Sequence, residues 1–260
     1  MRDLTRKVPK TWLLAAYGAA VLLLLAAPLF LSDFRLNLLA KFLAFAVLAL
    51  GLDLLWGYTG ILSLGQGVFF GLGAYSMAMY LKLEATGGKL PDFMSWSGLS
   101  KLPAYWLPFG HFAFALAAAI LLPALLAFAL GWVTFRNRVR GVYFTILTQA
   151  LVIIVVTLFV GQQGYTGGTN GITSFKTVLG YSLSDPQVKT ALYYITATVL
   201  IACFALCRLL VSTRFARVLE AIRDGENRVR FFGYDTALYQ SFAFALSAAF
   251  AGLAGVLFVF

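Results

Sequence analysis

Seven long apolar runs constrain what this chain can fold into more than any other feature. They cover residues 11–31, 37–55, 61–81, 111–135, 142–160, 191–210 and 240–260. Each is close to the roughly 17 to 25 residues that an α-helix needs to cross a bilayer. Charged residues make up only 12% of the chain, against about 25% in soluble domains. The sequence therefore predicts an all-α, polytopic membrane protein with about seven transmembrane helices, built as a single transmembrane domain over residues 1–260.

The basic residues gather in alternate loops between these runs. With a cytoplasmic N-terminus, the inner side receives Arg2, Arg6, Lys7, Lys10, Arg136, Arg138, Arg140, Arg208, Arg214, Arg217, Arg223, Arg228 and Arg230. An excess of Lys and Arg marks the cytoplasmic side of membrane proteins, so we expect the N-terminus there. Because the net charge of +10 is spread between membrane runs and forms no separate basic domain, it indicates contact with the lipid bilayer and no nucleic-acid partner.

The stretch GYTGILSLGQGVFFGLGAYSMAMYL, residues 57–81, is unusually rich in glycine for a membrane helix. At 100° per residue, a continuous helix places six small residues within an arc of about 80°: Gly60, Ser63, Gly67, Gly71, Ala74 and Ala78. Small residues at this spacing let two membrane helices approach closely. We therefore expect Gly67, Gly71, Ala74 and Ala78 to form a helix-packing face.

The start of the same stretch is harder to explain by packing. Gly57 and Gly60 flank Tyr58 and Thr59, a pattern that suggests a break in the helix. Non-helical backbone at membrane depth is tolerated where it lines a cavity or a transport path. Gly57, Tyr58, Thr59 and Gly60 are therefore candidates for a solute path. Two further candidates are Ser63 and Gln66.

The residues between 211 and 239 differ from the rest of the chain. In RFARVLEAIRDGENRVRFFGYD, apolar residues recur at helical spacing and Gly225 interrupts the pattern. Short amphipathic helices at the inner membrane surface fit this arrangement. Such a surface either contacts anionic lipid or docks onto a protein partner.

The sequence shows no set of residues that supports catalysis or metal binding. His111 is the only histidine, and Cys203 and Cys207 lie four residues apart inside an apolar run, where they suit packing. Ser63 lacks a G-x-S-x-G frame, and no phosphate-binding G-x-x-x-x-G-K-[ST] loop occurs. We expect no metal and no catalytic residue. A secondary transporter or channel remains an alternative to a subunit driven by a separate ATPase, and a membrane enzyme is a weaker one.

Three segments resemble the permease subunits of ABC importers for branched-chain amino acids and urea: GYTGILSLGQGVFFGLGAYSMAMYL, LEAIRDGENRVRFFGYD and SFAFALSAAFAGLAGVLF. LPDFMSWSG and QQGYTGGTNGITSFKT are more similar to the urea type. The resemblance implies a multi-pass protein of the bacterial cytoplasmic (inner) membrane that moves urea or short amides inward, or branched-chain amino acids as the alternative. The resemblance further implies that the protein is not itself an enzyme and needs no cofactor, because partner subunits bind and hydrolyse ATP. The implied partners are a second homologous permease, two cytoplasmic ATPase subunits and an extracytoplasmic binding protein.

The resemblance also assigns roles to particular residues. Within residues 211–239 it implies a cytoplasmic coupling segment that docks onto an ATPase through Glu220, Ala221, Ile222, Arg223, Asp224 and Gly233. Urea is neutral and rich in hydrogen-bonding groups, so amides and hydroxyls suit its path. We expect an outer mouth formed by Gln162, Gln163, Tyr165, Thr166 and Asn170. The chain stops at GVLFVF inside an apolar run, whereas members of the family continue, so we expect further C-terminal helices to be missing.

Overall fold

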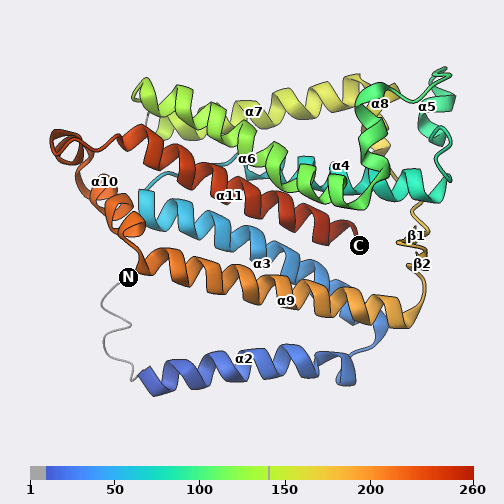
Figure 1. Ribbon diagram of the computed structural model, residues 1–260, viewed down its shortest axis with the longest axis horizontal. Helices are drawn as coiled ribbons and strands as arrows, with labels where there is room; N and C mark the ends of the chain where they lie inside the picture. The colour runs from blue at the N-terminus through green and yellow to red at the C-terminus, as the bar shows by residue number, and fades with distance from the viewer. Residues whose placement is uncertain (1–9, 140) are drawn as a thin grey trace.

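The computed structural model describes residues 10–139 and 141–260 and shows a bundle of long helices lying side by side (Figure 1). The long helices are α2 (Lys10–Phe30), α3 (Asp33–Thr59), α4 (Gln66–Ala85), α6 (Phe112–Arg136), α7 (Val142–Gly161), α9 (Pro186–Ser212) and α11 (Thr236–Val259). The prediction of an all-α polytopic membrane protein is confirmed. The basic residues before Lys10, and Arg140, lie outside the described residues.

Five of these helices, among the described residues, are long and apolar enough to cross a membrane: α3, α6, α7, α9 and α11. Within α2, residues Ala15–Phe30 form a further apolar stretch. Helix α4 is not one of the five; it contains Gln66, Lys82 and Glu84 and packs inside the bundle, against α6 and α11.

Helix α11 forms the centre of the bundle, in contact with α3, α4 and α6. In its most apolar stretch 67% of the residues are buried, against 11% for α7 at the periphery. Glycines make the close approach possible: a Cβ at Gly252 would overlap the carbonyl oxygen of Ala119 on α6, and one at Gly255 would overlap that of Phe70 on α4. The backbones of these helices therefore touch, as small residues allow in membrane bundles.

The two ends of the bundle carry different structures (Figure 1). One end holds α10 (Arg214–Phe231) together with the connections from α3 to α4 and from α6 to α7. The other end holds the short elements: α5 (Asp92–Trp96), η1 (Ala104–Gly110), α8 (Gln163–Thr166), η2 (Gly168–Asn170), β1 (Thr177–Val178) and β2 (Tyr181–Ser182). Strands β1 and β2 pair antiparallel, with Val178 opposite Tyr181. We call these the α10 end and the hairpin end.

Candidate functional site

The chain leaves helical geometry between α3 and α4, at the last residue of the GYTG stretch that predicts a break. Gly57, Tyr58 and Thr59 are still in the last turn of α3, so only Gly60 of the four belongs to the break. Helix α3 ends where Gly60 adopts φ 72°, a left-handed conformation, and its N–H donates to the carbonyl of Trp56 at 3.0 Å. Glycine takes this conformation without steric cost. The break therefore covers residues 60–65, and α4 begins at Gln66.

Hydroxyl groups satisfy the backbone of this break. The Thr148 hydroxyl accepts from the N–H of Leu64 at 3.2 Å, and the Thr145 hydroxyl donates to the carbonyl of Leu62 at 2.9 Å. Ser63 is buried and accepts from the N–H of Gly65 at 3.2 Å. Unpaired backbone groups are costly in an apolar interior. The two threonines of α7 therefore hold the break in place, a role that their spacing in an apolar run did not reveal.

The predicted packing face of residues 57–81 needs correction. Gly60 and Ser63 precede α4, so the six small residues do not share one helix face. Among the described residues, no atom of another helix lies within 4 Å of a Cβ built on Gly67 or Gly71, so neither glycine serves helix packing inside this chain. The close contact instead involves Gly73, where a Cβ would overlap the backbone of Gly252. Ala74 and Ala78 lie near that contact side, since Gly255 approaches Ala74 and Ala78 is buried.

Gly67 and Gly71 line a groove between α4 and α7. Its volume is about 540 Å³, and it follows α4 from Gly67 next to the break to Tyr75 near the hairpin end. The remaining lining comes from Val68 and Leu72 on α4, from α7, and from Gly168 and Thr169 of η2; the α7 residues are Val152, Val155, Val156, Phe159 and Val160. The missing side chains at positions 67 and 71 therefore leave space that the groove uses.

The groove is almost entirely apolar. Its side-chain hydroxyls are those of Tyr75 and Thr169, and the Tyr75 ring meets the Phe159 ring edge-on, with centroids 4.6 Å apart. Apolar lining with a few polar groups is the usual composition of a site for a small organic molecule. The groove thus suits a solute that carries aliphatic carbon better than one made only of hydrogen-bonding groups.

Gln66 does not line this groove. Its amide nitrogen donates to the Ser247 hydroxyl of α11 at 3.0 Å, while its buried amide oxygen has no partner among the described residues. Gln66 is therefore a link between the start of α4 and the central helix. Its place in a solute path stays a prediction.

The two groups of predicted path residues lie at opposite ends of the bundle. Those around the break lie at the α10 end, whereas α8 and η2 lie at the hairpin end (Figure 1). Gln162, Gln163, Tyr165 and Asn170 are exposed there. Thr166 is buried, and its hydroxyl donates to the carbonyl of Phe159 at 2.5 Å. The groove between α4 and α7 runs from one group toward the other.

Helix α10 contains the residues predicted to couple to an ATPase. It bends at Gly225, where the backbone leaves helical geometry, as the sequence predicts. Ala221, Arg223 and Asp224 are exposed, whereas Ile222 is buried against the bundle. Glu220 is half-buried, and Gly233 follows the helix at φ 85°. The segment thus presents one face outward and fixes the other to the bundle.

Arg223 connects α10 to the break. One guanidinium nitrogen, Nη1, donates to the carbonyl of Gly57 at 2.6 Å, and Nε donates to Asp224 at 3.0 Å. A Cβ on Gly60 would lie 2.9 Å from Cγ of Arg223, so glycine is also needed there for space. A cation at the C-terminal end of a helix interacts favourably with its dipole. Arg223 therefore binds the end of α3 in addition to lying on the exposed side of α10.

The second half of α10 is fixed by a buried polar network. Glu226 is 8% exposed and pairs with Arg230 at 2.7 Å. The Thr236 hydroxyl, at the start of α11, accepts from Arg230 at 2.8 Å and donates to Glu226 at 2.9 Å. Polar contacts thus attach α10 at two places, through Arg223 to the end of α3 and through Glu226 and Arg230 to the start of α11. As for metal binding, no group of three or more His, Cys, Asp or Glu within residues 10–139 and 141–260 could hold an ion.

Comparisons with known proteins match most of the chain. The family described as branched-chain amino acid transport system / permease component matches residues 34–260. Two high-affinity branched-chain amino acid transport system permease proteins LivM, from Escherichia coli K12 and Salmonella typhimurium LT2, are each 28% identical over 263 aligned positions. These alignments cover 92% of this chain and 56% of each relative, so the chain spans about half the length of the relatives it matches. No solved structure is significantly similar to the chain.

Proposed function

This chain belongs to the family of branched-chain amino acid transport system permease components, and we propose that it is a transmembrane subunit of an ABC importer. In this proposal it moves a small neutral or zwitterionic solute inward across the bacterial inner membrane. Partner subunits bind and hydrolyse the ATP. The single observation that carries the proposal is the groove between α4 and α7, which extends from Gly67, close to the break, to Gly168 and Thr169 of η2.

We propose branched-chain amino acids as the solute class. A Leu, Ile or Val side chain can lie against Val152, Val155 and Phe159, where burial of aliphatic carbon is favourable. Both relatives are described as branched-chain amino acid permeases, which supports the same class. Urea is the second candidate, supported by the exposed amides of Gln162, Gln163 and Asn170 at the hairpin end.

We also propose which side of the membrane each end of the bundle faces. Arg136 at the end of α6, Arg138 just after it and the arginines of α10 lie at the α10 end, and by the positive-inside rule they support a cytoplasmic position for this end. The hairpin end then faces outward, where an extracytoplasmic binding protein would deliver the solute. One of two ATPase subunits would dock at the exposed residues of α10, and a second, homologous permease subunit would complete the membrane part.

The test is uptake by the reconstituted complex of both permeases and the ATPases, supplied with the binding protein. We expect ATP-dependent uptake of leucine that excess unlabelled valine suppresses and excess urea does not. Uptake of urea in preference to leucine would favour the second candidate. Uptake by this chain without ATPase subunits would overturn the ABC proposal in favour of a secondary transporter or channel.

A further inference from the structure

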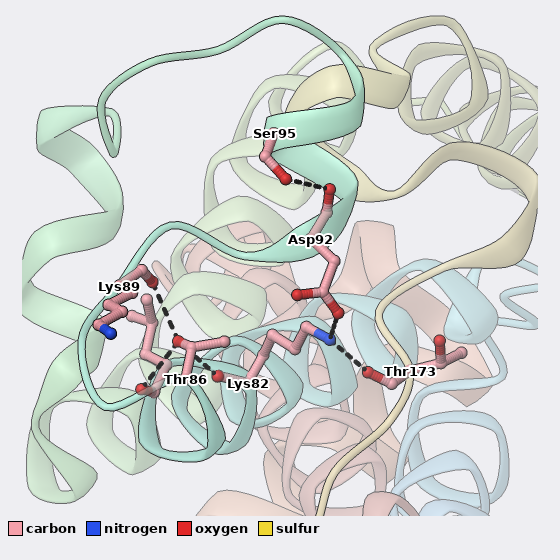
Figure 2. A network of polar contacts seen from close by, with 7 residues as sticks. Lys82, Thr86, Lys89, Asp92, Ser95 and Thr173 are labelled. Atoms are coloured by element: carbon pink, nitrogen blue, oxygen red, sulfur yellow. Dashed lines mark hydrogen bonds and ion pairs between the residues drawn. The ribbon is translucent and has the colours of Figure 1, made fainter.

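Lys82 is a buried cation at the hairpin end of α4. Its side chain is 6% exposed, and its ammonium group lies 2.9 Å from Oδ2 of Asp92 in α5. It also donates to the carbonyl of Thr173 at 3.2 Å (Figure 2). A buried charge persists only when it is paired and hydrogen-bonded. Lys82 therefore joins three segments that are far apart in sequence: α4, α5 and the residues after η2.

Asp92 is held ionised by this contact. The Lys82 ammonium group, through its hydrogen bond and its charge, lowers the pKa of the Asp92 carboxyl below its ordinary value. The Asp92 carboxyl thus stays ionised at neutral pH. Next to it, the Thr86 hydroxyl bonds to carbonyls of Lys82 and Lys89, which fixes the end of α4 (Figure 2).

The same turn of α4 binds the β1–β2 hairpin. The carboxylate of Glu84 accepts from the N–H of Gly180 at 2.6 Å and from that of Leu179 at 3.1 Å. Leu179 and Gly180 both have positive φ, at 50° and 81°, as a tight hairpin turn requires. The last turn of α4 therefore holds the segment after η2 at two places, Thr173 and the hairpin turn.

The segment that Lys82 and Glu84 hold follows η2 in the chain, and residues of η2 line one end of the groove. Gly168 and Thr169 line the groove, and a Cβ on Gly171 would lie 3.7 Å from the Tyr75 hydroxyl. Residues 167–171 form a tight loop, which we call the outer cap. Thr166 fixes its start through the carbonyl of Phe159, and Lys82 fixes the residues that follow it.

We propose that Lys82 is the positioning residue that keeps the outer cap over the mouth of the α4–α7 groove. The inference rests on the proposed function, because it gives the groove the role of solute path. Lys82 touches no part of the groove itself and acts through the carbonyl of Thr173. Neutralising it leaves Asp92 without its partner and releases the residues after the cap.

The experiment measures how fast a buried reporter next to the cap becomes accessible. Ile172 is 8% exposed, so Ile172→Cys is introduced with Cys203→Ala and Cys207→Ala into the assembled transporter in proteoliposomes. A membrane-impermeant maleimide is added from the hairpin side. We expect Lys82→Met to raise the labelling rate about tenfold or more, as local opening does, and Lys82→Arg to raise it less.

Two controls accompany the measurement. Lys89→Met removes a nearby exposed lysine whose side chain makes no contact in the network and should leave the rate unchanged. Gln187→Cys, exposed in the first turn of α9 and outside the cap and the groove, should label at the same rate with and without Lys82→Met. If Lys82→Met does not assemble, Asp92→Asn breaks the same ion pair and should also speed labelling of Ile172→Cys. An unchanged rate in the assembled variant overturns the role of Lys82.

Leucine flux in the same vesicles separates this inference from the proposed function. With Lys82→Met, we expect ATP-independent leakage of leucine to rise and coupled uptake to fall. Faster labelling with unchanged leakage and uptake would show that Lys82 holds the cap while the groove is not the solute path. Unchanged labelling with normal uptake would reject the positioning role and leave the proposed function intact.

Discussion

At the scale of single residues, two glycines only two positions apart in the sequence have different roles in this protein. Gly73 allows backbone contact between α4 and α11, because any side chain there would overlap Gly252. Gly71, two residues earlier, lies on the groove and has open space beside it. Helical periodicity identifies which small residues share a face, but it does not say which face meets a neighbouring helix. This is why the sequence predicts packing at Gly67 and Gly71 and misses Gly73.

The pair Gly71 and Gly73 gives a matched test. Gly73→Leu should prevent stable assembly, because overpacking a tight contact costs about 1–3 kcal/mol or more. Gly71→Leu should assemble normally and reduce leucine uptake about tenfold, equivalent to about 1.4 kcal/mol, because its side chain fills the groove. Assembly is measured by thermal stability and size-exclusion chromatography, and uptake in proteoliposomes. Normal uptake by Gly71→Leu would contradict the role given to the groove.

At the scale of elements, the break between α3 and α4 is held from two directions. Thr145 and Thr148 of α7 bind its backbone, and Arg223 of α10 binds the end of α3. The sequence indicates a break near Gly57 and an interruption at Gly225. It does not reveal the hydroxyls or the guanidinium that satisfy the backbone, because those contacts join residues more than eighty positions apart. The exact start of the break depends on which glycine takes the left-handed conformation, and this is Gly60.

Arg223→Ala tests whether α10 acts on the break. Removing the hydrogen bond to Gly57 should loosen the connection between α10 and α3, since a charge-assisted bond contributes about 1.5–3 kcal/mol when formed. We expect the amount of leucine imported per ATP hydrolysed to fall about fivefold to tenfold, with smaller change in ATP hydrolysis. Arg136→Ala is the control, because Arg136 lies over the Trp132 ring at the same end of the bundle. Equal coupling ratios in the two variants would contradict this role.

At the scale of the whole molecule, the two ends have different chemistry. The α10 end is basic and carries an exposed helix, while the hairpin end is built from short elements fixed by Lys82 and Glu84. Apolar runs and alternating basic loops predict the bundle and its polarity from the sequence alone. They do not predict Lys82 as a buried junction, because in sequence it is one lysine at the start of a long loop. Its pairing becomes visible only when Asp92 and Thr173 are seen beside it.

Glu220→Arg tests the docking role assigned to α10. Reversing this charge adds to an already basic segment and should repel a partner surface that accommodates a carboxylate. We expect leucine uptake to fall about tenfold and stimulation of ATP hydrolysis by solute to be lost, with Glu220→Gln intermediate. The readouts are uptake and ATPase rate in the same proteoliposomes. If Glu220→Arg supports normal uptake and normal stimulation, α10 does not dock through this position.

The most direct test of the account is solute protection of a cysteine inside the groove. Gly71→Cys, combined with Cys203→Ala and Cys207→Ala in the assembled transporter, provides a single reactive thiol on the lining of the groove. We expect leucine, delivered by the binding protein during ATP turnover, to slow labelling of this thiol about tenfold or more, a shift of about 1.4 kcal/mol. Modification of the thiol should in turn block uptake. Labelling that leucine does not change, with uptake that survives complete modification, would contradict the claim that solute passes between α4 and α7.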